Sequence, residues 1–361
     1  MIHVAVDANA LAWGWGGIPR YIERIVRLLA ERDDMRLTLL ANTSDPRIRL
    51  PGTTEVICRR RGGVVWRNAF VTDWLARRRP DVFWAPETLL PWRVPVPSVV
   101  TIHDLAALLF PGAKPLRVRV SYRTSIPHGV RRATRVMSVS NATAADAERL
   151  WGLAPDRVRV VAPGVDPVFG PADRVAARER VARDHGVRAP FVLAVGSLEP
   201  RKGLDVLIEA AALARARGDG WQLVLAGRAG HGGHGLVVRA TAAGALVTGG
   251  VDEASLLNLY RAADVVAVPS LYEGFGLTPL EAMACGTPAV IAGGSGGLEE
   301  VSGAAAVVVA RREAEAWRDA LARARADRER LAEAGVAHAA QFTWTRAADR
   351  TADVLLEAAA A

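Results

Sequence analysis

The stretch DVVAVPSLYEGFGLTPLEAMACGTPAVIAG, residues 264–293, decides the fold. It begins with a short apolar run typical of a buried strand, and it ends with a second run, PAVIAG. Between them, Thr278, Pro279 and Glu281 match the cap, first and third positions of a helix start, and Gly286 matches a helix stop. The stretch therefore predicts a strand, a helix over 279–285 and a second strand parallel to the first.

The same alternation runs outward from this stretch in both directions. In the second half, we expect helices at 203–217 and 253–263, and two helical segments over about 311–335 and 344–359 close the chain. In the first half, residues 3–9 predict a strand, and residues 19–32 predict a helix with Pro19 in its first turn. Further apolar runs predict the remaining strands: RLTLLAN, DVFWAP, SVVTIHD, RVMSVS, FVLAVGS, QLVLAG, ALVTGG and AAVVVA.

A Gly- and Pro-rich segment at 161–173 interrupts the alternation and is predicted to be a linker. The fold class is therefore α/β, with two doubly wound, Rossmann-like domains over residues 1–165 and 166–361. Ligands bind such sheets at the carboxyl ends of the strands, so we expect the site in a cleft between the two domains.

Composition excludes several classes of protein. The 361 residues, half of them hydrophobic, are too many for one ordinary core and suit two. Cys58 and Cys285 form no CxxC or Cys/His cluster, which argues against a disulfide framework or a zinc site. The first ten residues lack the pattern of a signal peptide, and no apolar run approaches the ~20 residues of a membrane helix. These features predict a cytoplasmic protein.

Charge is spread unevenly along the chain. Residues 1–165 hold 25 Arg and Lys against 14 Asp and Glu, a balance of +11, whereas residues 166–361 hold 21 against 24, a balance of −3. A basic first half suits an anionic partner, such as a membrane surface, a phosphate-bearing acceptor or nucleic acid. A solvated, arginine-rich face is the alternative. No nucleic-acid-binding motif accompanies the charge, so we expect no nucleic-acid partner and leave open a peripheral contact with an anionic membrane.

Candidate ligand-binding residues follow the predicted strands. Gly16 and Gly17 leave backbone amides bare before the first helix, an arrangement that suits a phosphate, although a plain loop is the alternative. His103 follows SVVTI and either contacts a ligand or is structural, and Asp104 suits the cap of the next helix.

The second half adds a stronger candidate. Gly196 allows close approach to the backbone after FVLAV, and Arg201 and Lys202 place two cations before a helix. A solvated pair of cations is the alternative. Glu281 has a local explanation as part of a capping box, but Glu273, beside Gly274 and Gly276, has none and needs a hydroxyl or a cation.

The quoted stretch resembles the E-x7-E signature of GT-B glycosyltransferases, in particular the retaining GT4 family (group 1). The resemblance extends to AVGSLEPRKGLDVLIEA, VTGGVDEASLLNLYRAADVVAVPS and FTWTRAADRT. The N-terminal half matches more loosely, through GGIPRY, TIHDL and SVSNAT, and these elements resemble mannosyltransferases. The resemblance implies a GT-B fold whose last helix, about 344–359, crosses back to the N-terminal, acceptor-binding domain, while the C-terminal domain binds the nucleotide-sugar donor.

The resemblance also implies roles for individual residues. His103, Glu273, Arg201 and Lys202 match the catalytic positions, with the two cations on the donor diphosphate and Glu273 and His103 near the reacting sugar. Glu281 matches the glutamate on the ribose hydroxyls. The other donor-binding positions are Gly16, Gly17, Gly196, Val251, Phe275, Gly276, Leu277 and Thr278.

The chemistry implied is transfer of a hexose from a nucleoside diphosphate sugar to a hydroxyl of a glycan, lipid-linked or natural-product acceptor. The resemblance favours mannose from GDP-mannose. Arg201 and Lys202 stabilise the leaving diphosphate in place of a metal ion, so neither a metal nor a cofactor is expected. Retention here is taken to proceed by front-face attack, and Glu273 is expected to orient the sugar and stabilise an oxocarbenium-like transition state rather than to act as a nucleophile.

Two other functions compete with this interpretation. A nicotinamide-dependent oxidoreductase needs G-x-G-x-x-G on its first turn, but residues 14–19 read GWGGIP and lack the last glycine. A sugar- or nucleotide-binding protein without catalysis would normally be exported and does not need two cations beside two acids.

Overall fold

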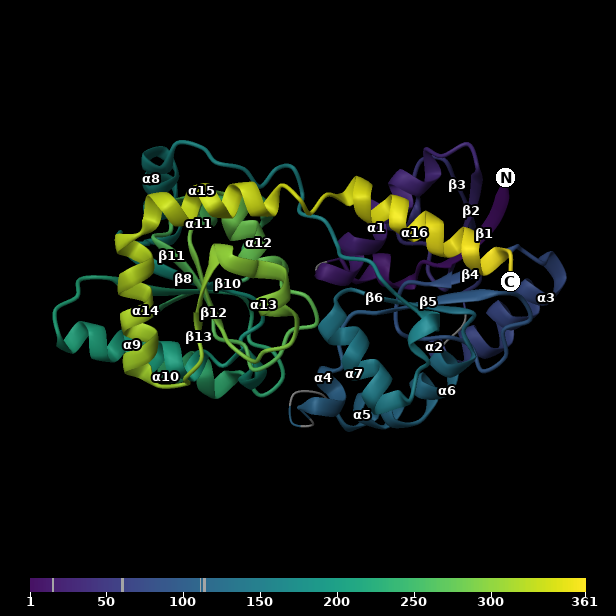
Figure 1. Cartoon of the computed structure of the whole chain (residues 1–361), viewed down its shortest axis with the longest axis horizontal. Helices are drawn as coiled ribbons and strands as arrows, with labels where there is room; N and C mark the ends of the chain where they lie inside the picture. The colour runs from purple at the N-terminus through teal and green to yellow at the C-terminus, as the bar shows by residue number, and fades with distance from the viewer. Residues whose placement is uncertain (15, 60–61, 111, 113–114) are drawn as a thin grey trace. The chain divides into compact units, whose positions relative to one another are not determined.

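The computed structural model describes residues 1–14, 16–59, 62–110, 112 and 115–361. The chain divides into two compact units, which are coloured along the chain in Figure 1. The first unit contains Met1–Leu108, Leu116–Gly164 and Thr343–Ala361, and the second contains Leu109–Pro115 and Val165–Phe342. The chain thus passes from the first unit to the second at residues 164–165, inside the segment predicted to be a linker, and returns before its last helix.

The first unit is built on a seven-stranded parallel sheet with the order β3-β2-β1-β4-β5-β6-β7. Its strands are β1 (Ile2–Asp7), β2 (Met35–Ala41), β3 (Thr53–Ile57), β4 (Val82–Ala85), β5 (Ser98–Ile102), β6 (Arg135–Ser138) and β7 (Val158–Val160). Its helices are α1 (Gly17–Ala30), α2 (Gly63–Val65), a π-helix (Trp66–Val71), α3 (Thr72–Arg78), α4 (Ala106–Leu109), α5 (Leu116–Arg123), α6 (Ser125–Arg132), α7 (Asn141–Trp151) and α16 (Trp344–Ala359).

The second unit is built on a six-stranded parallel sheet with the order β10-β9-β8-β11-β12-β13. Its strands are β8 (Phe191–Val195), β9 (Gln222–Ala226), β10 (Leu246–Gly249), β11 (Val265–Val268), β12 (Ala289–Ala292) and β13 (Ala306–Val309). Its helices are α8 (Arg174–His185), α9 (Leu204–Ala216), α10 (His234–Ala242), α11 (Glu253–Ala262), α12 (Leu277–Ala284), α13 (Gly297–Ser302), α14 (Ala314–Ala326) and α15 (Arg328–Ala339).

Both sheets are buried between helices, as near-continuous apolar strands require. In the first unit, Val4, Val6 and Trp84 of the central strands pack with Ile22 of α1 in one cluster of buried side chains. The second unit has two such clusters, which include Val192 and Leu193 of β8 respectively. The predicted α/β class with two doubly wound sheets is therefore confirmed.

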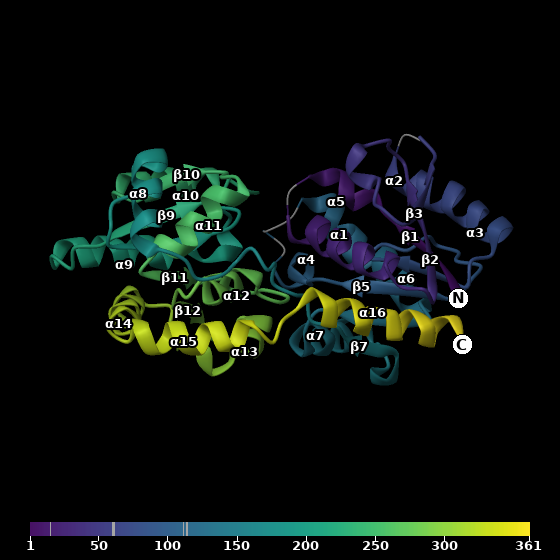
Figure 2. The ribbon, with the colours of Figure 1, turned by 90° about the horizontal axis from the view of Figure 1, so that it is seen from above.

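The last helix, α16, belongs to the first unit, as the sequence predicted. It packs along α1, and the Trp344 and Tyr21 rings meet edge to face with centroids 6.3 Å apart. Figures 1 and 2 both show α16 beside α1. Gly164 allows this return, because a Cβ on Gly164 would lie 2.3 Å from the backbone nitrogen of Trp344.

Several local predictions differ from the structure. The strands and helices that were not predicted are β3, β7, α2, the π-helix, α3, α5, α6, α8, α10 and α13. The segment predicted to be helical over 311–335 is two helices that meet at Asp327. Ser140 caps α7, because its side chain accepts a hydrogen bond from the Thr143 backbone N–H. Asp104 does cap α4 by accepting from the Ala106 N–H at 3.0 Å.

No helix in the described part of the chain is long and apolar enough to cross a bilayer. Contact with a membrane surface remains a prediction.

Candidate active site

The strand order of the second unit places its candidate site. Neighbouring strands β8 and β11 are the point at which the chain reverses its direction of growth across the sheet. Open parallel sheets bind their ligands at the carboxyl edge beside this switch point. Arg201 and Lys202 follow β8, and Glu273 follows β11. The topology therefore brings together residues that lie about 70 positions apart in the sequence.

Glu273 forms an ion cluster with both predicted cations. Its Oε1 lies 2.5 Å from Lys202 Nζ and accepts from the Ser270 hydroxyl at 2.7 Å, and its Oε2 lies 3.3 Å from Arg201 Nη1. Although burial opposes ionisation, Lys202 and Arg201 lower the pKa of Glu273 to about 2. The prediction that Glu273 needs a hydroxyl or a cation is confirmed, because the Ser270 hydroxyl, Lys202 and Arg201 all bond to it. It is ionised at neutral pH.

Arg201 is buried rather than solvated, which rejects the alternative of a surface pair of cations. Its guanidinium also donates to the Tyr272 carbonyl at 2.6 Å and to Glu199 at 3.1 Å. The local charges of Arg201 and Lys202 are thus matched by those of Glu199 and Glu273. Three hydrogen bonds fix the planar guanidinium of Arg201 in place. The Lys202 ammonium stands at the end of a flexible side chain and bonds to Glu273.

The N-terminus of α12 adjoins this cluster in the chain and has no side-chain cap. The cap position is Gly276, with φ +121, and the helix begins at Leu277. A Cβ on Gly276 would lie 2.8 Å from Leu298 Cδ2, so both conformation and packing require glycine. The predicted cap at Thr278 was wrong, because Thr278 lies inside the first turn. The uncapped amides and the helix dipole suit an anion.

Glu281 therefore has no role in a capping box, which corrects the local explanation derived from sequence. It is buried, and its Oε2 accepts a hydrogen bond from the Tyr260 hydroxyl of α11 at 2.8 Å. Burial and the neighbouring Glu281 raise the pKa of Tyr260 well above its usual value, so that the hydroxyl remains a donor. Tyr260 was not found by sequence reasoning, since nothing in its local pattern marks a partner 21 residues away.

The other predicted donor-side residues lie at the same edge of the second sheet or in the turn that leads to α12. Gly196 directly follows β8 with φ +130, and a Cβ there would be 3.7 Å from Lys202 Nζ. Val251 follows β10, and its side chain packs against the core. Phe275 is buried against Phe342, with ring centroids 6.0 Å apart, so its side chain is part of the core.

The remaining predicted residues lie in the first unit. Gly16 has φ +132 and stands before Gly17, the first residue of α1, which also has no side-chain cap. His103 follows β5, and its Nε2 donates to the Pro86 carbonyl at 2.6 Å. A carbonyl only accepts, so this tautomer leaves Nδ1 as the acceptor. Burial lowers the pKa of His103, which keeps the ring neutral.

Sequence reasoning missed a second ion cluster at the switch point of the first sheet. Arg67 of the π-helix donates through Nε to Asp7 Oδ2 at 2.8 Å and through Nη2 to Glu87 Oε2 at 2.5 Å. Asp7 ends β1 and Glu87 follows β4, the two strands beside this switch point. Burial and the proximity of Asp7 raise the pKa of Glu87 to about 7, although Arg67 opposes the shift. The sequence shows the two carboxyl groups at the ends of predicted strands, but nothing in it indicates that Arg67 pairs with them.

No group of three or more His, Cys, Asp or Glu side chains with the geometry of a metal site occurs among the described residues.

Comparison with known proteins identifies the family. A model described as "Glycosyl transferases group 1" matches residues 177–338, and one described as "Glycosyltransferase Family 4" matches residues 15–169. A D-inositol 3-phosphate glycosyltransferase from Saccharomonospora viridis is 38% identical over 316 residues, which are 80% of this chain and 68% of that protein. The chain belongs to the group 1 glycosyltransferases. A second relative of the same name, from Actinosynnema mirum, is 38% identical over 79% of this chain and 68% of its own length.

Several solved structures share the fold. A sucrose-phosphate synthase from Thermosynechococcus elongatus superposes with a TM-score of 0.76 at 22% identity over 99% of both chains. HepE of Anabaena in complex with UDP-glucose superposes with a TM-score of 0.78 at 19% identity over 99% of this chain and 100% of that one. At these identities the likeness concerns the GT-B fold alone. The family match leaves no support for the oxidoreductase or the non-catalytic binding protein.

Proposed function

We propose that this group 1 glycosyltransferase binds the diphosphate of a nucleoside diphosphate hexose at the carboxyl edge of its second sheet and transfers the hexose with retention of configuration. The observation that carries the proposal is the cluster of Arg201, Lys202 and Glu273 next to the uncapped start of α12. Departure of the nucleoside diphosphate builds negative charge, and two fixed cations with a helix N-terminus stabilise it.

In this proposal the ion cluster changes partners when the donor binds. The Lys202 ammonium exchanges the Glu273 carboxylate for a phosphate oxygen, and the released carboxylate accepts hydrogen bonds from hydroxyls of the hexose. Before the donor binds, Glu273 is ionised because Lys202 and Arg201 lower its pKa to about 2, and in this proposal Arg201 stays beside the carboxylate. It therefore accepts hydrogen bonds and stabilises positive charge at the anomeric carbon, but it does not protonate a leaving group.

Glu281, oriented by Tyr260, is proposed to accept the ribose hydroxyls of the donor. The hydrogen bond from Tyr260 at 2.8 Å fixes the rotamer of Glu281 within the core. Gly196 and the backbone before α12 are proposed to contact the sugar and its phosphates, and Val251 to present its backbone to the base.

The first unit is proposed to bind the acceptor. Asp7 and Glu87 provide carboxylate oxygens beside Arg67, and such groups suit the hydroxyls of a sugar or cyclic polyol. The curated relatives are named D-inositol 3-phosphate glycosyltransferases, so D-inositol 3-phosphate is the first acceptor to test. Since the chain spans about two thirds of the length of these relatives, its acceptor is assigned only by experiment.

The proposed donor is a nucleoside diphosphate hexose. Mannose from GDP-mannose, favoured by the resemblance in sequence, stays a prediction, and the names of these relatives do not mention it. Transfer is also proposed to need neither a metal ion nor a cofactor, because Arg201 and Lys202 supply the positive charge. Full activity in excess EDTA is the expected result, and activity restored only by Mg²⁺ or Mn²⁺ would contradict it.

The test is a thermal-shift titration with UDP, GDP, ADP, dTDP and NAD, followed by a transfer assay with the matching sugar donors. One nucleoside diphosphate is expected to raise the melting temperature, since a ligand that binds only the folded state stabilises it. The Lys202→Met variant should lose that shift, whereas Lys114→Met removes the chain's only other lysine and serves as the control. Equal shifts in wild type and Lys202→Met would refute the assignment of the diphosphate site.

A further inference from the structure

A basic pocket in the first unit is separate from both ion clusters. It has a volume of about 710 Å³ and lies among α5, α6 and α7, within the size range of small-molecule sites. Arg131 and Arg132 of its lining come just before β6, so they lie toward the amino ends of the strands, whereas Asp7, Glu87 and His103 lie at the carboxyl ends. The lining reaches Leu108, beyond the carboxyl end of β5, but it includes none of Asp7, Glu87 and His103, so the pocket is distinct from the proposed acceptor site.

The lining carries positive charge without compensation. Arg123, Arg131 and Arg132 contribute this charge, His128 adds an imidazole, and no Asp or Glu lines the pocket. The Arg131 Nε donates to the Trp151 carbonyl at 2.7 Å, which holds its guanidinium in place. Within the described part of the chain, Arg123, Arg132 and His128 make no ion pair or side-chain hydrogen bond, so these groups are available to an anion.

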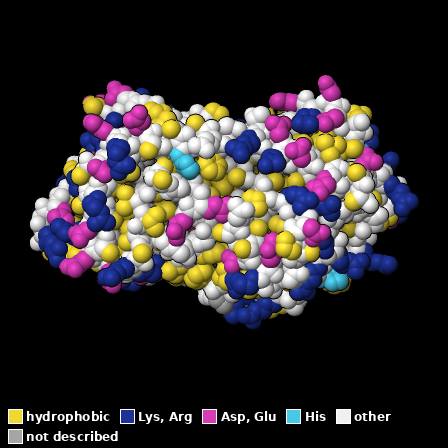
Figure 3. Space-filling view, in the orientation of Figure 1, with side chains coloured by type: hydrophobic (Ala, Val, Ile, Leu, Met, Phe, Trp, Pro, Cys, Tyr) yellow, Lys and Arg dark blue, Asp and Glu magenta, His cyan; other side chains and the backbone are white. Residues whose placement is uncertain are grey.

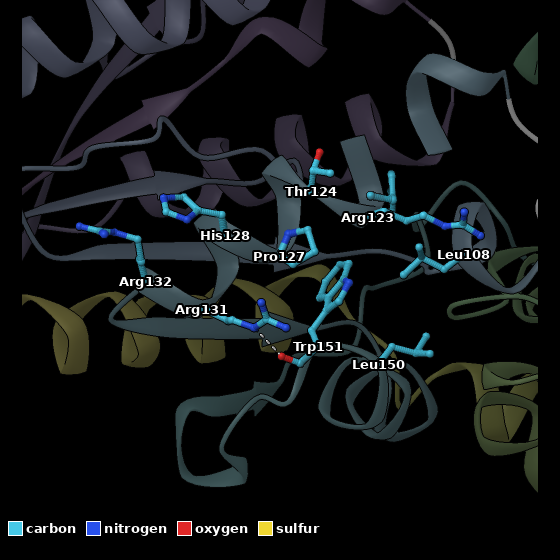
Figure 4. A pocket seen from close by; sticks show the side chains of 10 residues that line it. Leu108, Arg123, Thr124, Pro127, His128, Arg131, Arg132, Leu150 and Trp151 are labelled. Carbon is cyan, nitrogen blue, oxygen red and sulfur yellow. Dashed lines mark hydrogen bonds between the residues drawn. The ribbon is translucent and has the colours of Figure 1, made fainter. Parts of the chain in front are cut away.

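Apolar side chains share the pocket with these cations. Figure 4 shows the Trp151 ring between Arg131 and Thr124, with His128 and Arg132 at one end of the pocket and Arg123 and Leu108 at the other. A ligand that fits this lining has a compact anionic group and an apolar part.

Helix α5 extends the apolar part beyond the pocket. Leu116 and Val120 are 69% and 51% exposed, and none of the residues of α5 is buried. Leu116 and Val120 precede the pocket-lining Arg123 by seven and three positions, which places all three on one face of α5. Figure 3 shows Arg and Lys side chains gathered over the lower part of the first unit, where Figure 1 places α5. Exposed aliphatic groups beside arginines are typical of surfaces that meet lipid.

We propose that this pocket binds the phosphate headgroup of an anionic lipid, with the arginines on the phosphate and with Leu116 and Val120 against the apolar chains. The balance of +11 in residues 1–165 adds a long-range attraction to an anionic surface, but the pocket supplies a defined headgroup site. This proposal is independent of the donor and acceptor assignments.

The experiment is calorimetric titration of the full chain with three probes: dioctanoyl phosphatidic acid below its aggregation concentration, dioctanoyl phosphatidylcholine and inorganic phosphate. Arg132→Glu is the test variant. Arg78→Glu is the matched control, because Arg78 is exposed on α3 of the same unit and makes the same change in net charge. Melting temperatures of both variants check that they fold, and neither side chain has an ion pair in the described structure.

Binding of phosphatidic acid that weakens at least about fivefold in Arg132→Glu, but not in Arg78→Glu, supports the proposal. Equal weakening in the two variants would show a diffuse charge effect and overturn it. Inorganic phosphate that binds as tightly as phosphatidic acid would assign the pocket to free phosphate and overturn the lipid source. Equal binding of the zwitterionic lipid, or no binding of phosphatidic acid, would also overturn it.

Discussion

Glu273→Gln is expected to tighten the binding of a nucleoside diphosphate while it slows transfer. In the wild-type protein, Arg201 and Lys202 are matched by Glu199 and Glu273, so the diphosphate approaches a cluster without net charge. Replacing Glu273 by a neutral isostere gives that cluster a charge of +1. Binding becomes tighter and transfer becomes slower because the carboxylate repels the phosphate but accepts hydrogen bonds from the hexose hydroxyls.

The structure sets the size of the effect on binding. The Glu273 oxygens lie 2.5 Å from Lys202 Nζ and 3.3 Å from Arg201 Nη1. A phosphate on the same nitrogens would then be on the order of 6 Å from the carboxylate. Coulomb repulsion at that separation is about 3 kcal/mol for an effective dielectric constant of ~20, and about 1 kcal/mol for ~60. Loss of this repulsion corresponds to binding that is roughly five- to a hundredfold tighter.

The same substitution destabilises the second unit in a pH-dependent way. The pKa of Glu273 is lowered from 4.5 to about 2 in the folded protein, so ionisation stabilises the fold by about 3 kcal/mol above pH 4.5. This contribution is lost as the pH falls from 4.5 through 2. The melting temperature of Glu273→Gln should therefore be roughly 6–12 °C below wild type at pH 7, and the difference should shrink in acid.

Calorimetric titration with UDP and GDP at low salt, together with melting curves from pH 3 to pH 8, measures both effects. Glu179→Gln is the control, because Glu179 is exposed on α8 of the same unit and has the same change of charge. Nucleoside diphosphate binding that weakens in Glu273→Gln would refute the exchange of partners. An unchanged melting temperature at pH 7 would refute the ion cluster itself.

Three further outcomes follow from the geometry. Tyr260→Phe removes the donor to Glu281, so the KM for the sugar donor should rise about three- to tenfold with kcat little changed, as steady-state kinetics would show; a fall in kcat alone contradicts the positioning role. Burial raises the pKa of Glu87 to about 7, so ionised Glu87 destabilises the fold. The melting temperature of Glu87→Gln minus that of wild type should therefore increase as the pH rises from 4.5 through 7, and a difference that shrinks over this range contradicts the shift. Arg67→Met should slow transfer at saturating donor while UDP or GDP binding by calorimetry stays within about twofold, and loss of nucleotide binding would contradict an acceptor-side role.

The sequence predicted the architecture because parallel strands buried on both faces are continuous apolar runs. Residues 191–195, 222–226 and 265–268 illustrate this pattern. Strand β3 escaped prediction because TTEVI is polar and lies at the sheet edge, where only part of each residue is covered. Strand β7, with only three residues, is too short to leave a pattern.

The sequence predicted which residues form the candidate site, but not which of them bond to one another. Local spacing placed Arg201, Lys202 and Glu273 after strands, and the switch-point rule places such positions at one edge of the sheet. The sequence did not show that the Glu273 carboxylate and the two cations neutralise one another, because their contacts span about 70 residues. For Glu281, the local signal was misleading. Its resemblance to a capping box came from Thr278 and Pro279, which lie inside the helix rather than at its start.

The two switch points share one arrangement and differ in one residue. In each unit an arginine bonds two carboxylates that flank the switch: Arg67 with Asp7 and Glu87, and Arg201 with Glu199 and Glu273. The first cluster carries one excess negative charge when both carboxyl groups are ionised. Burial and the charge of Asp7 together raise the pKa of Glu87. Lys202 brings the second cluster to neutrality and keeps Glu273 ionised.

This difference sorts the two proposed ligands. A diphosphate would be repelled by the first cluster, but at the second it can replace Glu273 on a mobile ammonium without leaving a buried charge unpaired. The hydroxyls of an acceptor carry no charge, so they can meet Asp7 and Glu87 without that repulsion. In this proposal, Lys202 is the residue that makes one of two similar edges a donor site. Its removal is expected to make the second edge as unfavourable to a diphosphate as the first.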